Sequence, residues 1–141
     1  MKKILIINSS YYQDVSKNLL ASASKKLLQK KFHIKKLEVA GVYEIPTAIR
    51  KNIKKFDGFI ALGCVIKGQT PHFDLICLSV FNSILNLSVK FNKPIGNGII
   101  TALNISQARQ RSKKNDNNKP NKGLEAAKAV ISILNNAIKK I

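Results

Sequence analysis

The chain has 141 residues, 45% of them hydrophobic, which fits a single globular domain over residues 1–141 and argues against a two-domain enzyme. The 25 Lys and Arg against 7 Asp and Glu give a net charge of +18, a value that would ordinarily indicate nucleic-acid binding. Since the excess consists of scattered lysines, without the Arg-rich arm or recognition helix of nucleic-acid modules, we interpret it as a solvated basic surface with no nucleic-acid partner.

The chain carries no signal for membrane insertion or metal binding. Its apolar opening, residues 1–7, reaches Asn8 too soon for a signal peptide, and no uninterrupted apolar run approaches the roughly 20 residues of a membrane span. We therefore expect a cytoplasmic protein with no membrane partner. Cys64 and Cys77 lie within apolar runs and lack ligand spacing, so we expect packing roles, with neither a disulfide framework nor a metal site.

The first half of the chain alternates strand and helix patterns. Residues 3–8 form an apolar run of strand length, and a helix with Asp14 as its N-cap keeps one apolar face as far as residues 30–31. Residues 32–39 resemble a second, less buried strand. A turn at residues 41–44 leads into a short helix with proline in its first turn.

The second half repeats this alternation. The expected elements are a very apolar, central strand at 59–66, a loop at 67–72, a long helix to residue 91, a strand at 95–101, an Asn104-capped helix to about residue 111 and a loop at 113–121. The last helix has an apolar seam repeating at three and four residues, formed by Leu124, Ala127, Ile131, Leu134, Ile138 and Ile141.

Strands that alternate with helices, without hairpin turns, predict parallel βαβ units. We therefore expect an α/β fold, a three-layer α-β-α sandwich with a four-stranded parallel sheet and flavodoxin-like architecture. Ligands of such folds bind beyond the carboxyl ends of the strands, which selects the loops at 8–13, 40–44, 66–72 and 101–104.

The loop at 66–72 holds the most chemistry. Residues 63–70 nearly match a Walker A loop, but Gln69 stands where the phosphate-binding lysine is required, which excludes an ATPase. Gln69 and Thr70 still precede a helix start, where free amides and the helix dipole favour an anion, although a plain βα turn would look the same. His72 follows, and because a helix N-terminus favours the neutral imidazole, it is the best candidate for proton transfer.

Other candidate residues have two interpretations each. Tyr11, beside Tyr12, either stacks on a flat heterocycle or belongs to an aromatic rim. Glu44 either caps the short helix or helps to hold a polar ring. Arg111 and Lys122 bracket the polar loop and either bind an anion or lie on the solvated surface.

Three motifs resemble those of the 6,7-dimethyl-8-ribityllumazine synthase family: residues 41–46 (GVYEIP), residues 62–74 (LGCVIKGQTPHFD) and residues 121–123 (NKG). The resemblance is collinear from about Ile4 to the C-terminus. It implies a transferase of riboflavin biosynthesis that condenses 5-amino-6-(D-ribitylamino)uracil with 3,4-dihydroxy-2-butanone 4-phosphate and requires neither cofactor nor metal.

The resemblance also implies roles for individual residues. His72 falls on the proton-transfer position, Arg111 on the phosphate-binding arginine, and Gln69 and Thr70 on the loop that holds the butanone phosphate. Tyr11 falls on the stacking position. The remaining substrate-binding positions are Val42, Tyr43, Glu44, Cys64, Val65, Ile66, Asn97 and Lys122.

The family assembles as homopentamers, some closing into hollow shells, with active sites at subunit interfaces. Arg111 and Asn97 would then reach a neighbour's site. Asn97 replaces a common phenylalanine, the loop before Lys122 is about three residues longer than usual, and the chain begins almost at its first expected strand. Because the last two features and the like charge would weaken contacts between pentamers, we expect an isolated pentamer. Alternatives are a basic nucleic-acid-binding α/β domain and a non-catalytic shell protein.

Overall fold

The computed structural model describes residues 1–114, 120–136 and 138–141. Its elements in chain order are β1 (Lys3–Ser9), α1 (Gln13–Gln29), β2 (His33–Val39), the 3-10 turn η1 (Val42–Glu44), α2 (Ile45–Lys51), β3 (Gly58–Ile66), α3 (His72–Phe91), β4 (Ile95–Ala102), α4 (Ile105–Gln110) and α5 (Lys122–Asn135).

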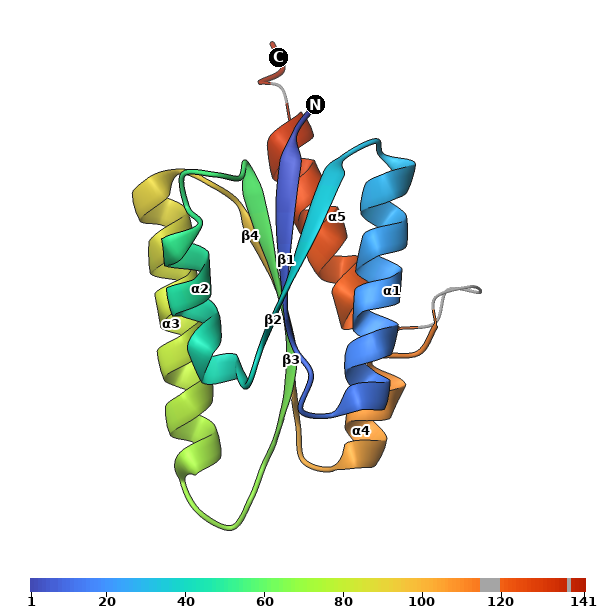
Figure 1. Ribbon diagram of the computed structural model, residues 1–141, viewed down its shortest axis with the longest axis vertical. Helices are drawn as coiled ribbons and strands as arrows, with labels where there is room; N and C mark the ends of the chain where they lie inside the picture. Colours follow the sequence, from blue (N-terminus) through green and yellow to red (C-terminus); the bar gives the residue numbers. More distant parts are fainter. Residues whose placement is uncertain (115–119, 137) are drawn as a thin grey trace.

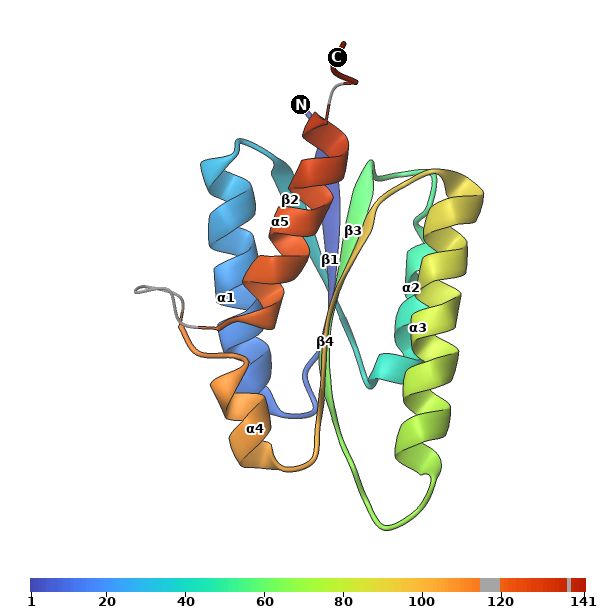
Figure 2. The same ribbon diagram turned by 180° about the vertical axis from the view of Figure 1, so that it is seen from behind.

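The four strands form a parallel sheet in the order β2-β1-β3-β4. Figure 1 shows this sheet nearly edge-on between two helical layers, with α2 and α3 on one side and α1, α4 and α5 on the other, and the reverse view in Figure 2 agrees. The predicted three-layer sandwich is therefore confirmed. β3 lies inside the sheet, as its apolar sequence predicted, and β4 is an edge strand.

Each face of the sheet has its own core, because successive side chains of a strand point to opposite faces. Ile4 and Ile6 of β1 face the layer of α1 and α5, whereas Leu5 and Ile7 face η1, α2 and α3. β2 is mostly exposed, as expected for the less buried strand.

The predicted N-cap of α1 is wrong, whereas the predicted N-cap of α4 is confirmed. Tyr12, and not Asp14, takes the N-cap position of α1; Asp14 lies in the first turn, where its Oδ2 accepts a hydrogen bond from Arg109 Nε at 2.9 Å. That bond lowers the pKa of Asp14. At α4, in contrast, the Asn104 side chain accepts from the Gln107 N–H, which confirms the predicted cap.

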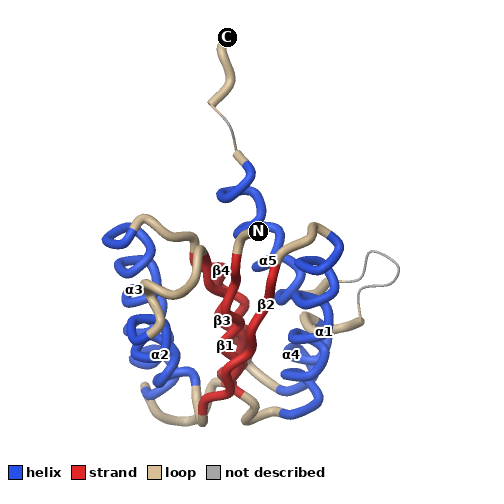
Figure 3. The backbone as a smooth tube through the Cα atoms, turned by 45° about the horizontal axis from the view of Figure 1, so that its top comes forward, coloured by secondary structure: helices blue, strands red, loops and turns tan. Residues whose placement is uncertain are grey.

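α5 ends at Asn135, so the predicted apolar seam is too long. Ile138 and Ile141 lie beyond the helix and are fully exposed. Figure 3 shows the end of the chain extending away from the body of the molecule, where it has no sheet to cover. A repeat of apolar residues does not by itself maintain a helix where the helix has no surface to pack against. Residues 115–119 of the predicted 113–121 loop lie outside the described residues.

α3 packs on the sheet through a narrow face, in which Val80 and Ile84 are buried. Within the described part of the chain, it is the one helix whose length and composition would suit a membrane span, with a mean hydropathy of 1.4 and 11% of that window buried. Its outward face therefore carries large apolar side chains, namely Leu75, Leu78, Leu85 and Val89.

Candidate active site

The carboxyl ends of the central strands open into a cavity of about 770 Å³. Four segments that are distant in sequence contribute to it: the end of β1, the η1 turn, the end of β3 and the first turn of α3. The side chains in its wall include Tyr11, Val42, Tyr43, Glu44, Cys64, Val65, Ile66 and His72. Eight of the predicted site residues thus meet in one place. Sequence reasoning missed Ser9 and Ile76, which also line it.

Tyr11 is held at the rim of this cavity by the turn between β1 and α1. The buried Ser16 hydroxyl donates to Asn8 Oδ1 at 2.9 Å and lies 3.1 Å from the Ser9 carbonyl oxygen, which ties the start of α1 to the end of β1. Tyr12 packs against the core and contacts Tyr11 edge-on, with ring centroids 4.9 Å apart. Tyr11 itself is 76% exposed, so a face of its ring is accessible to a ligand.

The η1 turn supplies one wall of the cavity. Val42 is buried and packs so closely over β3 that a Cβ added to Gly63 would lie 2.6 Å from Val42 Cγ1. Glu44 holds the N-cap position of α2, but its side chain makes no capping hydrogen bond within the described residues. Of the two interpretations of Glu44, helix capping is therefore wrong, and its exposed carboxylate is available at the cavity.

Cys64 lines the cavity but is not an activated nucleophile. It is 8% exposed, and burial raises the pKa of its thiol to about 11. At neutral pH the group therefore stays a protonated thiol, which packs as a small apolar side chain. This agrees with the packing role predicted for Cys64.

His72 is the first residue of α3 and is exposed to the cavity. Its backbone N–H donates a hydrogen bond to Thr70 Oγ1 at 3.4 Å, which ties the preceding loop to the start of α3. Gln69 and Thr70 are exposed on that loop. The structure places them next to His72 but outside the wall of the cavity in a single chain.

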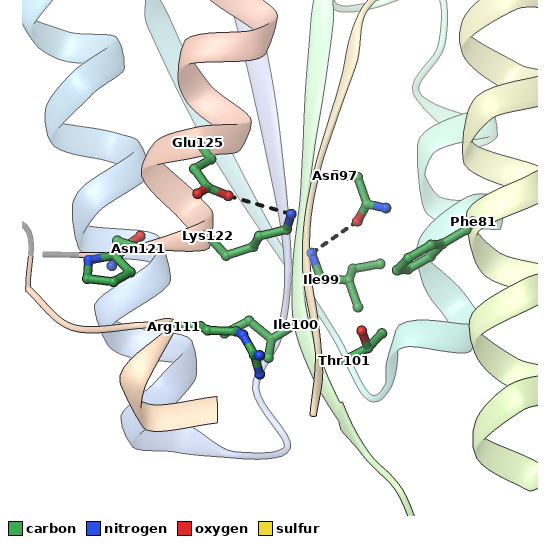
Figure 4. Close-up of a pocket in the computed structure, with 10 residues that line it drawn as sticks. Phe81, Asn97, Ile99, Ile100, Thr101, Arg111, Asn121, Lys122 and Glu125 are labelled. Atoms are coloured by element: carbon green, nitrogen blue, oxygen red, sulfur yellow. Dashed lines mark hydrogen bonds and ion pairs between the residues drawn. The ribbon is translucent and has the colours of Figure 1, made fainter. Parts of the chain in front are cut away.

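Asn97, Arg111 and Lys122 lie in a second pocket, of about 410 Å³, on the outer side of the edge strand β4 (Figure 4). Lys122 Nζ forms an ion pair with Glu125 Oε2 at 3.5 Å. Asn97 Oδ1 accepts from the N–H of Ile99, two residues along β4, at 3.0 Å. Glu125 and Phe81, which also line this pocket, were missed, although the spacing of Glu125 from Lys122 places both on one face of a helix.

The predicted site is therefore divided in a single chain. The described residues that line the two pockets have no member in common, and Arg111 does not belong to the wall that contains His72. The cavity with His72 contains tyrosine rings and an imidazole, whereas the second pocket contains the cationic side chains of Arg111 and Lys122 together with the carboxylate of Glu125. The described residues contain no group of three or more His, Cys, Asp or Glu side chains that could hold a metal ion.

Comparisons with known proteins relate the whole chain to one family. The sequence model of the family described as 6,7-dimethyl-8-ribityllumazine synthase matches residues 1–137. The chain is 36% identical over 133 residues to the 6,7-dimethyl-8-ribityllumazine synthase of Bartonella tribocorum, which covers 92% of this chain and 88% of the relative. It is 34% identical over 138 residues to that of Methylorubrum extorquens, covering 93% and 80%. The enzyme of Limosilactobacillus reuteri is 39% identical over 115 residues, covering 78% and 74%.

Proposed function

Because this chain belongs to the 6,7-dimethyl-8-ribityllumazine synthase family, we propose that it condenses 5-amino-6-(D-ribitylamino)uracil with 3,4-dihydroxy-2-butanone 4-phosphate. The products are 6,7-dimethyl-8-ribityllumazine, inorganic phosphate and water. The chain is thus a transferase of riboflavin biosynthesis, and the family match does not favour a nucleic-acid-binding domain.

The observation that carries this proposal is the convergence of eight predicted residues on one cavity from four segments of the chain. A flat pyrimidinedione fits a wall with an exposed tyrosine, Tyr11, and its polar edges fit the carboxylate of Glu44 and the backbone groups of the η1 turn. Val65 and Ile66, at the carboxyl end of β3, lie along the same wall and would border the ribityl chain.

We assign to His72 the transfer of protons during the condensation. The 5-amino group attacks the ketone and water leaves, giving an imine; phosphate is then eliminated, and the ribitylamino nitrogen closes the second ring with loss of another water. Each of these steps transfers a proton, and an imidazole has one ring nitrogen that can donate a proton and another that can accept one. No step needs a strong nucleophile, which is consistent with the protonated thiol of Cys64.

The departing phosphate requires a fixed positive environment. Arg111 and Lys122 supply a guanidinium and an ammonium in the second pocket, and Gln69 and Thr70 supply the loop beside His72. These groups act on one substrate only if the second pocket of one chain lies against the cavity of another. We therefore place the complete active site at an interface between two copies.

The exposed face of α3 supports assembly with further copies. Leu75, Leu78, Asn82, Leu85 and Val89 alternate spacings of three and four residues, which is the pattern of a helix-to-helix seam with one polar position. We propose that neighbouring copies of the chain cover this face in a homopentamer. Since each chain carries +18, we further propose that the pentamers do not close into a larger shell.

The direct test is to mix the purified protein with both substrates and follow the absorbance of the lumazine product. We expect product formation without added metal or cofactor, from a species that sediments as a pentamer. A pentamer or shell that binds substrates without turnover would instead support the alternative of a non-catalytic shell protein. Salt-sensitive duplex binding without turnover would support the alternative of a nucleic-acid-binding domain.

A further inference from the structure

Asn121 is a buried polar residue at the base of the second pocket, and both ends of its side-chain amide are hydrogen-bonded. It is 2% exposed. Its Oδ1 accepts from the N–H of Leu124 at 3.0 Å, which caps α5. Its Nδ2 donates to the carbonyl of Lys113 at 2.9 Å and to the carbonyl of Asn18 on α1 at 3.3 Å.

The backbone next to Asn121 joins the same segments. Asn121 forms an antiparallel bridge with Ser112, and the N–H of Lys122 donates to the carbonyl of Arg111 at 2.8 Å. The Ser112 hydroxyl, which is buried, donates to the carbonyl of Ala108 in α4 at 3.0 Å. We call the Ser112–Asn121 bridge with these hydrogen bonds the 112–121 clamp.

We propose that Asn121 is a positioning residue for phosphate recognition. Arg111 directly precedes Ser112, and Lys122 directly follows Asn121. The clamp therefore fixes the backbone positions from which both cationic side chains extend. The two bonds donated by the Asn121 amide hold the clamp against α1 and against the backbone at Lys113. Cationic groups that are fixed in advance lose less freedom when they bind an anion. This inference rests on the proposed function.

The chemistry of the amide separates this role from helix capping. Asn, Asp and Ser all serve as N-caps, since each provides an oxygen that accepts from the first turn. Of the three, only Asn combines that acceptor with an NH₂ group that can donate two bonds. Asn121→Asp and Asn121→Ser therefore keep the cap of α5 and remove the bonds to Asn18 and Lys113, and the second variant does so without adding charge.

Asn104 provides a matched control. It caps α4, the helix that leads to Arg111, and its Oδ1 accepts from the Gln107 N–H at 2.9 Å. Asn104→Asp and Asn104→Ser make the same chemical changes at an exposed cap whose hydrogen bond both substitutes can retain.

The experiment measures the affinity for inorganic phosphate by calorimetry and the KM of each substrate in the assembled enzyme. For both Asn121 variants we expect phosphate affinity to fall, and the KM of the butanone phosphate to rise, by about tenfold or more, because displaced binding groups lose much of their effect. The KM of the pyrimidine should change by less than about twofold, and both Asn104 variants should leave all three quantities within about twofold.

Any of three results would overturn the role of Asn121. The first is unchanged phosphate affinity accompanied by a lower Tm, which would leave a structural role alone. The second is an equal rise in both KM values, and the third is an equal effect of the Asn121 and Asn104 variants. If the unmodified protein makes no lumazine, the proposed reaction fails, but the phosphate calorimetry still decides whether Asn121 positions the cationic groups.

Discussion

At the scale of single residues, two histidines in one chain provide an internal comparison. His72 lines the cavity at the start of α3, whereas His33 lies on the exposed strand β2, away from both pockets. We predict that His72→Ala lowers kcat by about 100-fold with little change in either KM, because it removes a proton carrier and leaves the binding groups in place. Steady-state formation of the lumazine product measures both constants.

His33→Ala serves as the control and should retain the kcat of the unmodified enzyme. Near-normal turnover of His72→Ala with both substrates bound would show that another group moves the protons. An equal loss in both variants would assign the effect to folding.

Cys64 makes a pH-dependent contribution that can be measured. Burial raises the pKa of its thiol from an ordinary value of 9.0 to about 11. Between pH 9.0 and about pH 11 the unfolded chain releases a proton that the folded chain retains. The free energy of unfolding therefore falls as pH rises through this range, and Cys64 does not change it below pH 9.0. Urea unfolding at several pH values should show the stability advantage of the unmodified protein over Cys64→Ala shrinking between pH 9 and 11. A pH-independent difference would contradict the assignment.

At the scale of elements, α5 approaches α1 closely at Gly123. A Cβ added there would lie 2.4 Å from the carbonyl oxygen of Leu19, which is backbone and cannot rotate away. We predict that Gly123→Ala destabilises the protein by about 1–3 kcal/mol despite the better helix propensity of alanine, because the two helices must separate.

Gly68→Ala is the matched control, since an added Cβ at Gly68 meets nothing within 4 Å in the described part of the chain. Thermal unfolding of both variants should lower Tm for the Gly123 substitution and leave it nearly unchanged for the Gly68 substitution. Equal Tm values would mean that α1 and α5 are not packed as closely as described.

The order and type of the elements were predictable from the sequence, because strands such as β3 and helices such as α1 carry long periodic patterns. Element ends were predictable where one side chain sets them, as Asn104 does for α4. Asp14 had a cap-forming residue type, but it pairs with Arg109, which is distant in sequence. The end of α5 depends on where the sheet stops, and apolar spacing does not encode that position.

The candidate site was predictable in part for the same reason. Loop positions after parallel strands identified the wall that holds His72, because the topology brings those loops together. The family resemblance implied that Arg111 reaches a neighbour's site, and the structure places it outside the wall that holds His72. The hydrogen bond from Asn121 to Asn18 joins segments that are distant in sequence, and the motif at residues 121–123 does not identify that partner.

At the scale of the whole molecule, the account depends on two pockets of different chains forming one site. Although the chain carries +18, no Lys or Arg is among the described residues that line the cavity with His72. Lysines on the solvated surface contribute little to a specific site, since exposed charges are screened by salt. We therefore propose that assembly, and not overall charge, brings Arg111 and Lys122 to the imidazole.

The most direct measurement of this claim mixes two variants of low activity, His72→Ala and Arg111→Ala, under conditions that exchange subunits. If each site takes its imidazole from one chain and its guanidinium from the next around a ring, random mixing in equal amounts restores about a quarter of the unmodified activity. Each variant alone stays at its own low level. If both groups of a site came from one chain, the mixture would show only the average of the two variants, and that result would contradict the shared site.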